Sequence, residues 1–151
     1  MPDELETKMV ISLDAFLPEY YVESPSQRME LYKKIAHIKT EEDLLDIENE
    51  LTDRFGKMPR EAKNLFSVAI VKAYAQRAKF KKVEQLRAEV RLYPSEVNLP
   101  LFVEISQFDR KNVQICGIKQ TPYISVKHDP SEDFSKRALE VIKFYIQKSN
   151  N

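Results

Sequence analysis

The chain has 151 residues, of which 42% are hydrophobic and 32% are charged, a balance typical of a folded globular protein. Its 24 basic and 24 acidic residues cancel, which argues against a protein whose main role is to grip a phosphate backbone, although a local basic patch is compatible with this balance. The single cysteine, Cys116, can form no internal disulfide, so we expect a reducing, cytoplasmic environment. No apolar run reaches membrane-spanning length, and we expect no membrane contact.

The first two predicted elements are a strand and a helix. Residues 1–7 are expected to be frayed, and the apolar alternation that follows predicts a strand over residues 8–15. Ser24 is a good helix N-cap because Pro25 follows at the first helical position, and Gln27 stands at the capping-box spacing. A helix is therefore predicted from this point to the lysines that precede the next element.

The stretch from Thr40 to Pro59 is a predicted helix with both ends marked in the sequence. Thr40 and Asp43 have the spacing of a capping box, in which each side chain satisfies a free backbone N–H of the other. Gly56 can take the left-handed conformation that ends a helix, and Pro59 lies just beyond it. Apolar residues at three- and four-residue steps predict the buried stripe: Leu44, Ile47, Leu51 and Phe55.

The opposite side of this helix is acidic. At about 100° per residue, four acids fall within a sector roughly 80° wide, and we call them the acidic face: Glu42, Asp46, Glu50 and Asp53. No lysine or arginine lies between Thr40 and Asp53 to relieve their repulsion. Two interpretations stay open at this point. The acidic face is either a solvated helix surface or a docking strip for a surface that bears arginines.

The rest of the chain alternates between helical and strand patterns. A long apolar helix is predicted from Pro59 to about Lys79, and the later elements are strands over 83–86 and 88–93, a helix over 98–108, strands over 112–118 and 122–127, and a helix over 131–148. The order is β-α-α-α-β-β-α-β-β-α, which contains no series of parallel βαβ units. We therefore predict an α+β fold with helices against a mainly antiparallel sheet, in a single domain over residues 1–151.

Motifs for catalysis or cofactor binding are absent from the sequence. There is no Gly-rich phosphate loop, no HExxH zinc motif and no GxSxG elbow. His37 stands at the end of a predicted helix, where we interpret it as a partner of the helix dipole. Cys116 lies in an apolar alternation and is interpreted as a small hydrophobic residue. We expect no catalytic, cofactor-binding or metal-binding residue in this chain.

A basic segment offers a second candidate site. Lysines and arginines recur over residues 72–91, from the last turns of the third helix into the following strands, and four of them could contact nucleic acid: Lys79, Lys81, Lys82 and Arg87. The alternative interpretation is a helix end with dipole-complementing cations, followed by a solvated strand face. Aromatic residues are not interleaved with these cations, as a base-stacking platform would require.

The end of the acidic helix resembles a known signature. The residues ELTDRFG at positions 50–56, followed by Pro59, resemble the EL-x-DRFG-x-x-P motif of the C-terminal domain of bacterial transcription-repair coupling factors. The segment DAFLP at 14–18 and the residues Arg28, Tyr32, Lys33 and Ile35 fit two further patterns of that family. The family has a glycine near the end of the third helix, where this sequence has Ala78-Lys79-Phe80.

This resemblance implies a regulatory role. Full-length members are ATP-driven DNA translocases that displace stalled RNA polymerase and recruit the repair protein UvrA. Their motor modules, with the ATP and magnesium sites, lie upstream of the C-terminal domain, so the fragment itself is expected to be non-enzymatic and monomeric.

In the family, the C-terminal domain packs on the UvrA-binding module of the same polypeptide and masks it. The acidic positions of the family motif face arginines of that module, and they match Glu50 and Asp53 here. Asp46 and Glu42 are weaker candidates for the same interface, and a structural role is expected for the remaining motif residues: Arg54, Phe55, Gly56 and Pro59.

Overall fold

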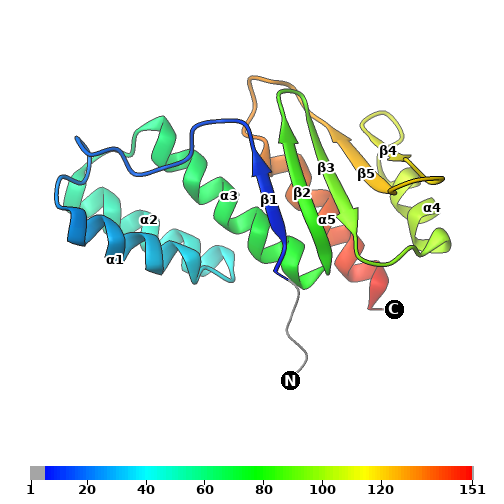
Figure 1. The fold of residues 1–151 in the computed structure, drawn as a ribbon, viewed down its shortest axis with the longest axis horizontal. Coiled ribbons are helices and arrows are strands. Elements are labelled where there is room, and N and C mark those ends of the chain that lie inside the picture. Colours follow the sequence, from blue (N-terminus) through cyan, green and yellow to red (C-terminus); the bar gives the residue numbers. More distant parts are fainter. Residues whose placement is uncertain (1–5, 151) are drawn as a thin grey trace. The chain divides into compact units, whose positions relative to one another are not determined.

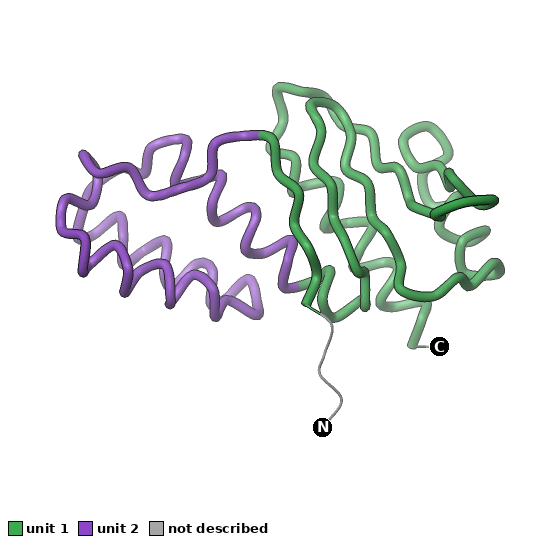
Figure 2. The backbone as a smooth tube through the Cα atoms, viewed as in Figure 1, with its two compact units in different colours: residues 1–12, 74–151 green, residues 13–73 purple. Residues whose placement is uncertain are grey.

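The structure, a computed structural model, describes residues 6–150, and its backbone forms two compact units (Figure 2). One unit contains the chain up to Ser12 together with the part that begins at Tyr74, and the other spans Leu13–Ala73. The elements, in chain order (Figure 1), are β1 (Lys8–Ile11), α1 (Pro25–Ala36), α2 (Glu41–Phe55), α3 (Arg60–Arg77), β2 (Phe80–Leu86), β3 (Glu89–Pro94), α4 (Leu99–Phe108), β4 (Val113–Cys116), β5 (Tyr123–Lys127) and α5 (Ser135–Ser149). The predicted α+β class and element order are confirmed.

The first unit is built on a five-stranded sheet in the order β1-β2-β3-β5-β4. Strand β1 runs parallel to β2, and the other three pairs are antiparallel, so the sheet is mainly antiparallel as predicted. Along β3, Val90 and Leu92 are fully buried while Glu89 and Arg91 are partly exposed, which is the alternation of a half-buried strand. Helices α4 and α5 lie on one face of this sheet (Figure 1).

The second unit contains α1, α2 and most of α3. Helix α1 begins where the sequence predicts, because the Ser24 hydroxyl accepts a hydrogen bond from the Gln27 N–H at 3.3 Å. The buried residues of α1 are Leu31 and Ile35, whereas Met29 is 63% exposed. Leu51 is the fully buried residue of α2.

Several element boundaries differ from the sequence-based prediction, among them the start of β2 at Phe80 rather than at residue 83. Two of these differences follow from local side chains that bind the backbone. Strand β1 ends at Ile11 rather than at residue 15, since the Ser12 N–H donates to the buried Gln85 side chain at 2.9 Å and so turns the chain away from the sheet. Helix α5 begins at Ser135 rather than at residue 131. There the carboxylate of Asp133 accepts from the Ser135 N–H at 2.9 Å, which favours a turn before the helix.

The predicted frayed start, residues 1–7, falls mostly outside the described residues. Within them, Thr7 is buried, and its hydroxyl donates to the Phe80 carbonyl at 2.7 Å, so the chain is anchored from this residue. Prediction of a single domain stays a prediction, because each of the two units is compact by itself.

Lys79 lies within Ala78-Lys79-Phe80, the stretch in which the resemblance predicts a glycine. Its φ is +60°, and it is the one described residue other than glycine in the left-handed region. The Ser95 N–H donates to the Lys79 carbonyl at 3.1 Å, which ties this backbone to the end of β3. A side chain with a Cβ is strained at such a φ by roughly 1–2 kcal/mol.

Replacing Lys79 with glycine is expected to stabilise the chain. The relieved strain exceeds the extra freedom of glycine in the unfolded state, which leaves a net gain of about 0.5–1 kcal/mol. Chemical denaturation of Lys79→Gly measures this gain. The matched control is Lys63→Gly on the exposed side of α3, where the same substitution costs about 1 kcal/mol. Equal losses in both variants would contradict the assignment of strain to Lys79.

Candidate docking surface on helix α2

The start of α2 is fixed by the predicted capping box. The Asp43 N–H donates to the Thr40 hydroxyl at 3.1 Å, and the Asp43 carboxylate accepts from the N–H groups of Thr40 at 3.2 Å and Lys39 at 3.0 Å. These hydrogen bonds, chiefly the one from Lys39, lower the pKa of the Asp43 carboxyl. The hydrogen bonds satisfy N–H groups that would otherwise lack a partner, and the carboxylate places negative charge at the positive end of the helix dipole. Both effects favour a helix that begins here.

The end of α2 depends on Gly56 and on a tyrosine from earlier in the chain. Gly56 has φ +84° and ψ −166°, so its positive φ was predicted correctly, but its ψ is extended rather than helical. That backbone region is essentially restricted to glycine, although a Cβ here would meet no atom within 4 Å. The Tyr21 hydroxyl donates to the carbonyls of Gly56 at 2.8 Å and Leu51 at 3.3 Å. The shorter bond satisfies the Gly56 carbonyl, which the helix end leaves without an intrahelical partner, and the Leu51 carbonyl shares the same hydroxyl proton.

Phe55 and Arg54 stack in turn on Tyr21, from the end of α2 outward to the surface. The Phe55 ring lies against the Tyr21 ring, with centroids 5.8 Å apart, and the Arg54 guanidinium lies 4.9 Å above the Phe55 ring. Arg54 therefore projects along the helix surface instead of over the last carbonyls. Pro59 stands immediately before α3, and its carbonyl accepts from the Lys63 N–H at 3.1 Å.

Glu50 has partners within its own unit. Its carboxylate accepts from the Lys34 ammonium of α1 at 3.1 and 3.2 Å and from Arg54 at 2.7 Å. The side chain is 29% exposed, and these two partners, Lys34 first, lower the pKa of its carboxyl. The Arg54 pairing follows the i, i+4 spacing that favours Glu before Arg on a helix. Lys34 is 16 residues away in sequence, so its pairing with Glu50 could not be predicted from the sequence.

The other three members of the acidic face are exposed and unpaired. Within residues 6–150, no hydrogen bond or ion pair reaches the side chains of Glu42, Asp46 or Asp53. Leu45, which precedes Asp46 in α2, is 57% exposed. The resulting surface carries uncompensated negative charge beside an accessible aliphatic side chain, which is chemically suited to a partner with arginine and apolar groups.

The basic segment does not gather into one site. Lys79 and Lys81 lie at the beginning of β2, whereas Arg87 lies in the turn after its end, about 20 Å away along an extended strand. The Lys82 ammonium lies 4.2 Å above the Tyr93 ring and is thus held on the sheet. Nucleic-acid contact by these residues stays a prediction, and these four residues form no concentrated basic patch that would support it.

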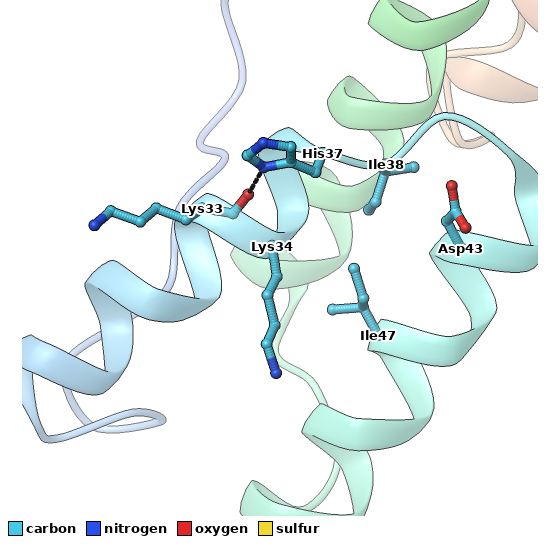
Figure 3. Close-up of a pocket in the computed structure, with 6 residues that line it drawn as sticks. All are labelled: Lys33, Lys34, His37, Ile38, Asp43 and Ile47. Carbon is cyan, nitrogen blue, oxygen red and sulfur yellow. Dashed lines mark hydrogen bonds between the residues drawn. The ribbon is translucent and has the colours of Figure 1, made fainter.

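The groove between α1 and α2 gathers no set of groups suited to catalysis. It is open, has a volume of about 380 Å³, and is lined by Lys33, Lys34, His37, Ile38, Asp43 and Ile47 (Figure 3). Its one carboxylate, Asp43, is occupied by the helix cap, and the His37 ring contacts the Lys33 carbonyl at 2.6 Å. Among the described residues, no cluster of potential metal ligands occurs, and no helix has the length and apolarity to cross a membrane.

Comparison with known proteins places these residues in a family context. The family described as TRCF domain matches residues 11–100. A transcription-repair-coupling factor of Bacillus subtilis (strain 168) is 35% identical over 94 residues, which are 62% of this chain and 8% of that protein. The corresponding protein of Escherichia coli (strain K12) is 34% identical over 79 residues, or 52% of this chain and 7% of the relative.

A solved structure extends the similarity to the whole fold. The crystal structure of the C-terminal domain of a transcription-repair coupling factor superposes with a TM-score of 0.77, covering 95% of this chain and 92% of that one. The two share 19% sequence identity, so this match shows the fold alone. The chain spans less than a tenth of the length of the curated relatives that it matches.

Replacing Tyr21 with phenylalanine is expected to lower the free energy of unfolding by about 1–2 kcal/mol, because the Gly56 carbonyl loses its donor and the Leu51 carbonyl loses its share of the same proton. The ring contact with Phe55 is retained in this variant. Urea denaturation measures the change, and Tyr20→Phe is the control, since Tyr20 is 73% exposed. An equal effect of the two substitutions would contradict the role assigned to the Tyr21 hydroxyl.

The capping box predicts a pH-dependent stability. Because the pKa of Asp43 is lower in the folded state, its contribution is fully present above the unfolded pKa and is lost as the pH falls through the folded pKa. The difference in Tm between the wild type and Asp43→Ala is therefore expected to be largest near neutral pH and to shrink in acid. Glu42→Ala, in the same turn, is the control. A difference that does not change with pH would exclude the carboxylate as the source.

Proposed function

Because the chain belongs to the TRCF domain family, we propose that it is a regulatory docking domain which masks the UvrA-binding module of the same polypeptide in the resting state. The observation that carries this proposal is the acidic face, on which Asp53, Asp46 and Glu42 are exposed and have no ionic partner within residues 6–150. Carboxylates in this state keep their full capacity for an arginine, since no internal pair has to be broken first.

The geometry of α2 supports an oriented contact. Between Glu42 and Asp53 the helix rises about 16 Å, so two or three guanidinium groups on a facing surface can be matched in register. Charge pairs of this kind mainly set orientation and specificity, and they contribute modest affinity. A modest affinity is functionally suitable because a mask has to open when the rest of the protein changes conformation.

The same proposal assigns the remaining activities to other parts of a longer protein. The parent would be an ATP-dependent DNA translocase in the cytoplasm that displaces stalled RNA polymerase and recruits UvrA for excision repair. ATP and magnesium would bind its motor modules, and this chain would contribute regulation without catalysis. Motif residues Arg54, Phe55, Gly56 and Pro59 would support the docking helix, and Glu50 and Asp53 would face the partner's arginines.

Binding of the 151-residue chain to a recombinant UvrA-binding module tests this function. Asp53→Asn is expected to weaken binding by roughly fivefold to thirtyfold if the pair is desolvated, and Asp46→Asn by less. Isothermal titration calorimetry measures the dissociation constants, which should also rise with salt. The matched control is Glu30→Gln, an exposed acid on α1 that is outside the acidic face.

Two results would contradict the proposal. One is the absence of binding by the wild type at low salt, and the other is an Asp53→Asn variant that binds as well as Glu30→Gln. Salt-dependent binding of DNA in place of the module would favour the basic segment as the functional surface.

A further inference from the structure

Glu50 differs from its neighbours on the acidic face because its charge is already neutralised within the chain. The Lys34 ammonium lies 3.1 Å from Oε1 and 3.2 Å from Oε2, so it bridges both oxygens of the carboxylate. The Arg54 guanidinium donates to Oε2 at 2.7 Å. A carboxylate offers about four acceptor positions, and this arrangement uses both of its oxygens.

The two cations are held with different firmness. Arg54 belongs to the same helix as Glu50 and lies over the Phe55 ring, which in turn packs on Tyr21. Lys34 reaches across from α1, and its side chain is 52% exposed. An ammonium on a flexible four-carbon chain is strongly hydrated, and it is readily returned to water when a better partner arrives. Lys34 is therefore the partner of Glu50 that can be displaced.

We infer that Lys34 is a built-in competitor for the docking partner, which weakens the engagement of Glu50 and so limits the strength of the mask. This inference rests on the proposed function of the acidic face. A guanidinium that binds Glu50 in the two-pronged geometry needs both carboxylate oxygens, and Lys34 occupies that position. Docking at Glu50 thus replaces an existing ion pair, whereas docking at Asp53 forms a new one.

The competition assigns different roles to the two motif acids. Asp53, unpaired within residues 6–150, provides the attraction that brings the partner to α2. Glu50 adds a contact whose gain is offset by the loss of Lys34. The net effect is a mask that is correctly oriented but easily released, and its strength is set by a residue of α1 that lies outside the signature motif.

Removing the competitor is expected to tighten docking. Lys34→Met keeps the length of the side chain without its charge, and the affinity of the 151-residue chain for the UvrA-binding module should rise roughly twofold to fivefold, the range of one exposed ion pair. The matched control is Lys33→Met, the adjacent exposed lysine of α1, which makes the same change in net charge. Its effect should stay below about 1.5-fold.

A double-mutant cycle locates the effect at Glu50. With Lys34 present, Glu50→Gln should change the dissociation constant by no more than about twofold, and in the Lys34→Met background the same substitution should weaken binding by roughly fivefold. An independent readout is the pKa of the Glu50 carboxyl, measured by NMR titration of the unbound chain. It should rise in Lys34→Met and stay unchanged in Lys33→Met.

The outcomes separate this inference from the proposed function. Absence of binding by the wild type overturns the proposed function and the inference together. If the wild type binds and Asp53→Asn weakens it, but Lys34→Met gains no more than Lys33→Met, the docking surface stands and the competition by Lys34 is refuted. A Glu50 pKa that is the same in Lys34→Met and the wild type also refutes it.

Discussion

The hydrogen bonds from the Tyr21 hydroxyl to the carbonyls of Gly56 and Leu51 are the interaction on which the rest of the candidate surface depends. They complete the end of α2 at the one glycine whose extended, positive-φ backbone lets the chain leave the helix. The same tyrosine ring supports Phe55, and Phe55 supports Arg54. A buried donor from an earlier segment thus determines how the charged side chains of the last two helical turns are presented to solvent.

A division of charge follows from this support. Arg54, fixed over an aromatic ring, neutralises Glu50 together with Lys34, and the negative potential of α2 is consequently concentrated on the three acids that have no partner in the described chain. A row of like charges on one helix face costs a few tenths of a kcal/mol per pair. The capping box at the start of α2 and the Tyr21 hydrogen bonds at its end offset that cost. The helix therefore stays folded while its outer face stays exposed to a partner.

Local signals predicted most of the fold, and long-range contacts account for what was missed. The caps at Ser24 and Thr40 were readable because a cap is decided by residues three apart. The parallel pairing of β1 with β2 was not, since three helices separate the two strands and no periodicity records the partner of a strand. The candidate site divides in the same way: the acidic face follows from helical spacing, whereas Lys34 and Tyr21 reach α2 from other segments.

We propose that this domain meets its partner with the outer face of α2. Chemical-shift mapping by NMR tests it most directly, with the isotope-labelled 151-residue chain titrated with an unlabelled UvrA-binding module. The largest shift changes are expected on α2 at Glu42, Asp46 and Asp53, with smaller ones at Lys34 on α1. Changes confined to the β2–β3 hairpin, or none at a concentration of module that saturates other probes of binding, would contradict it.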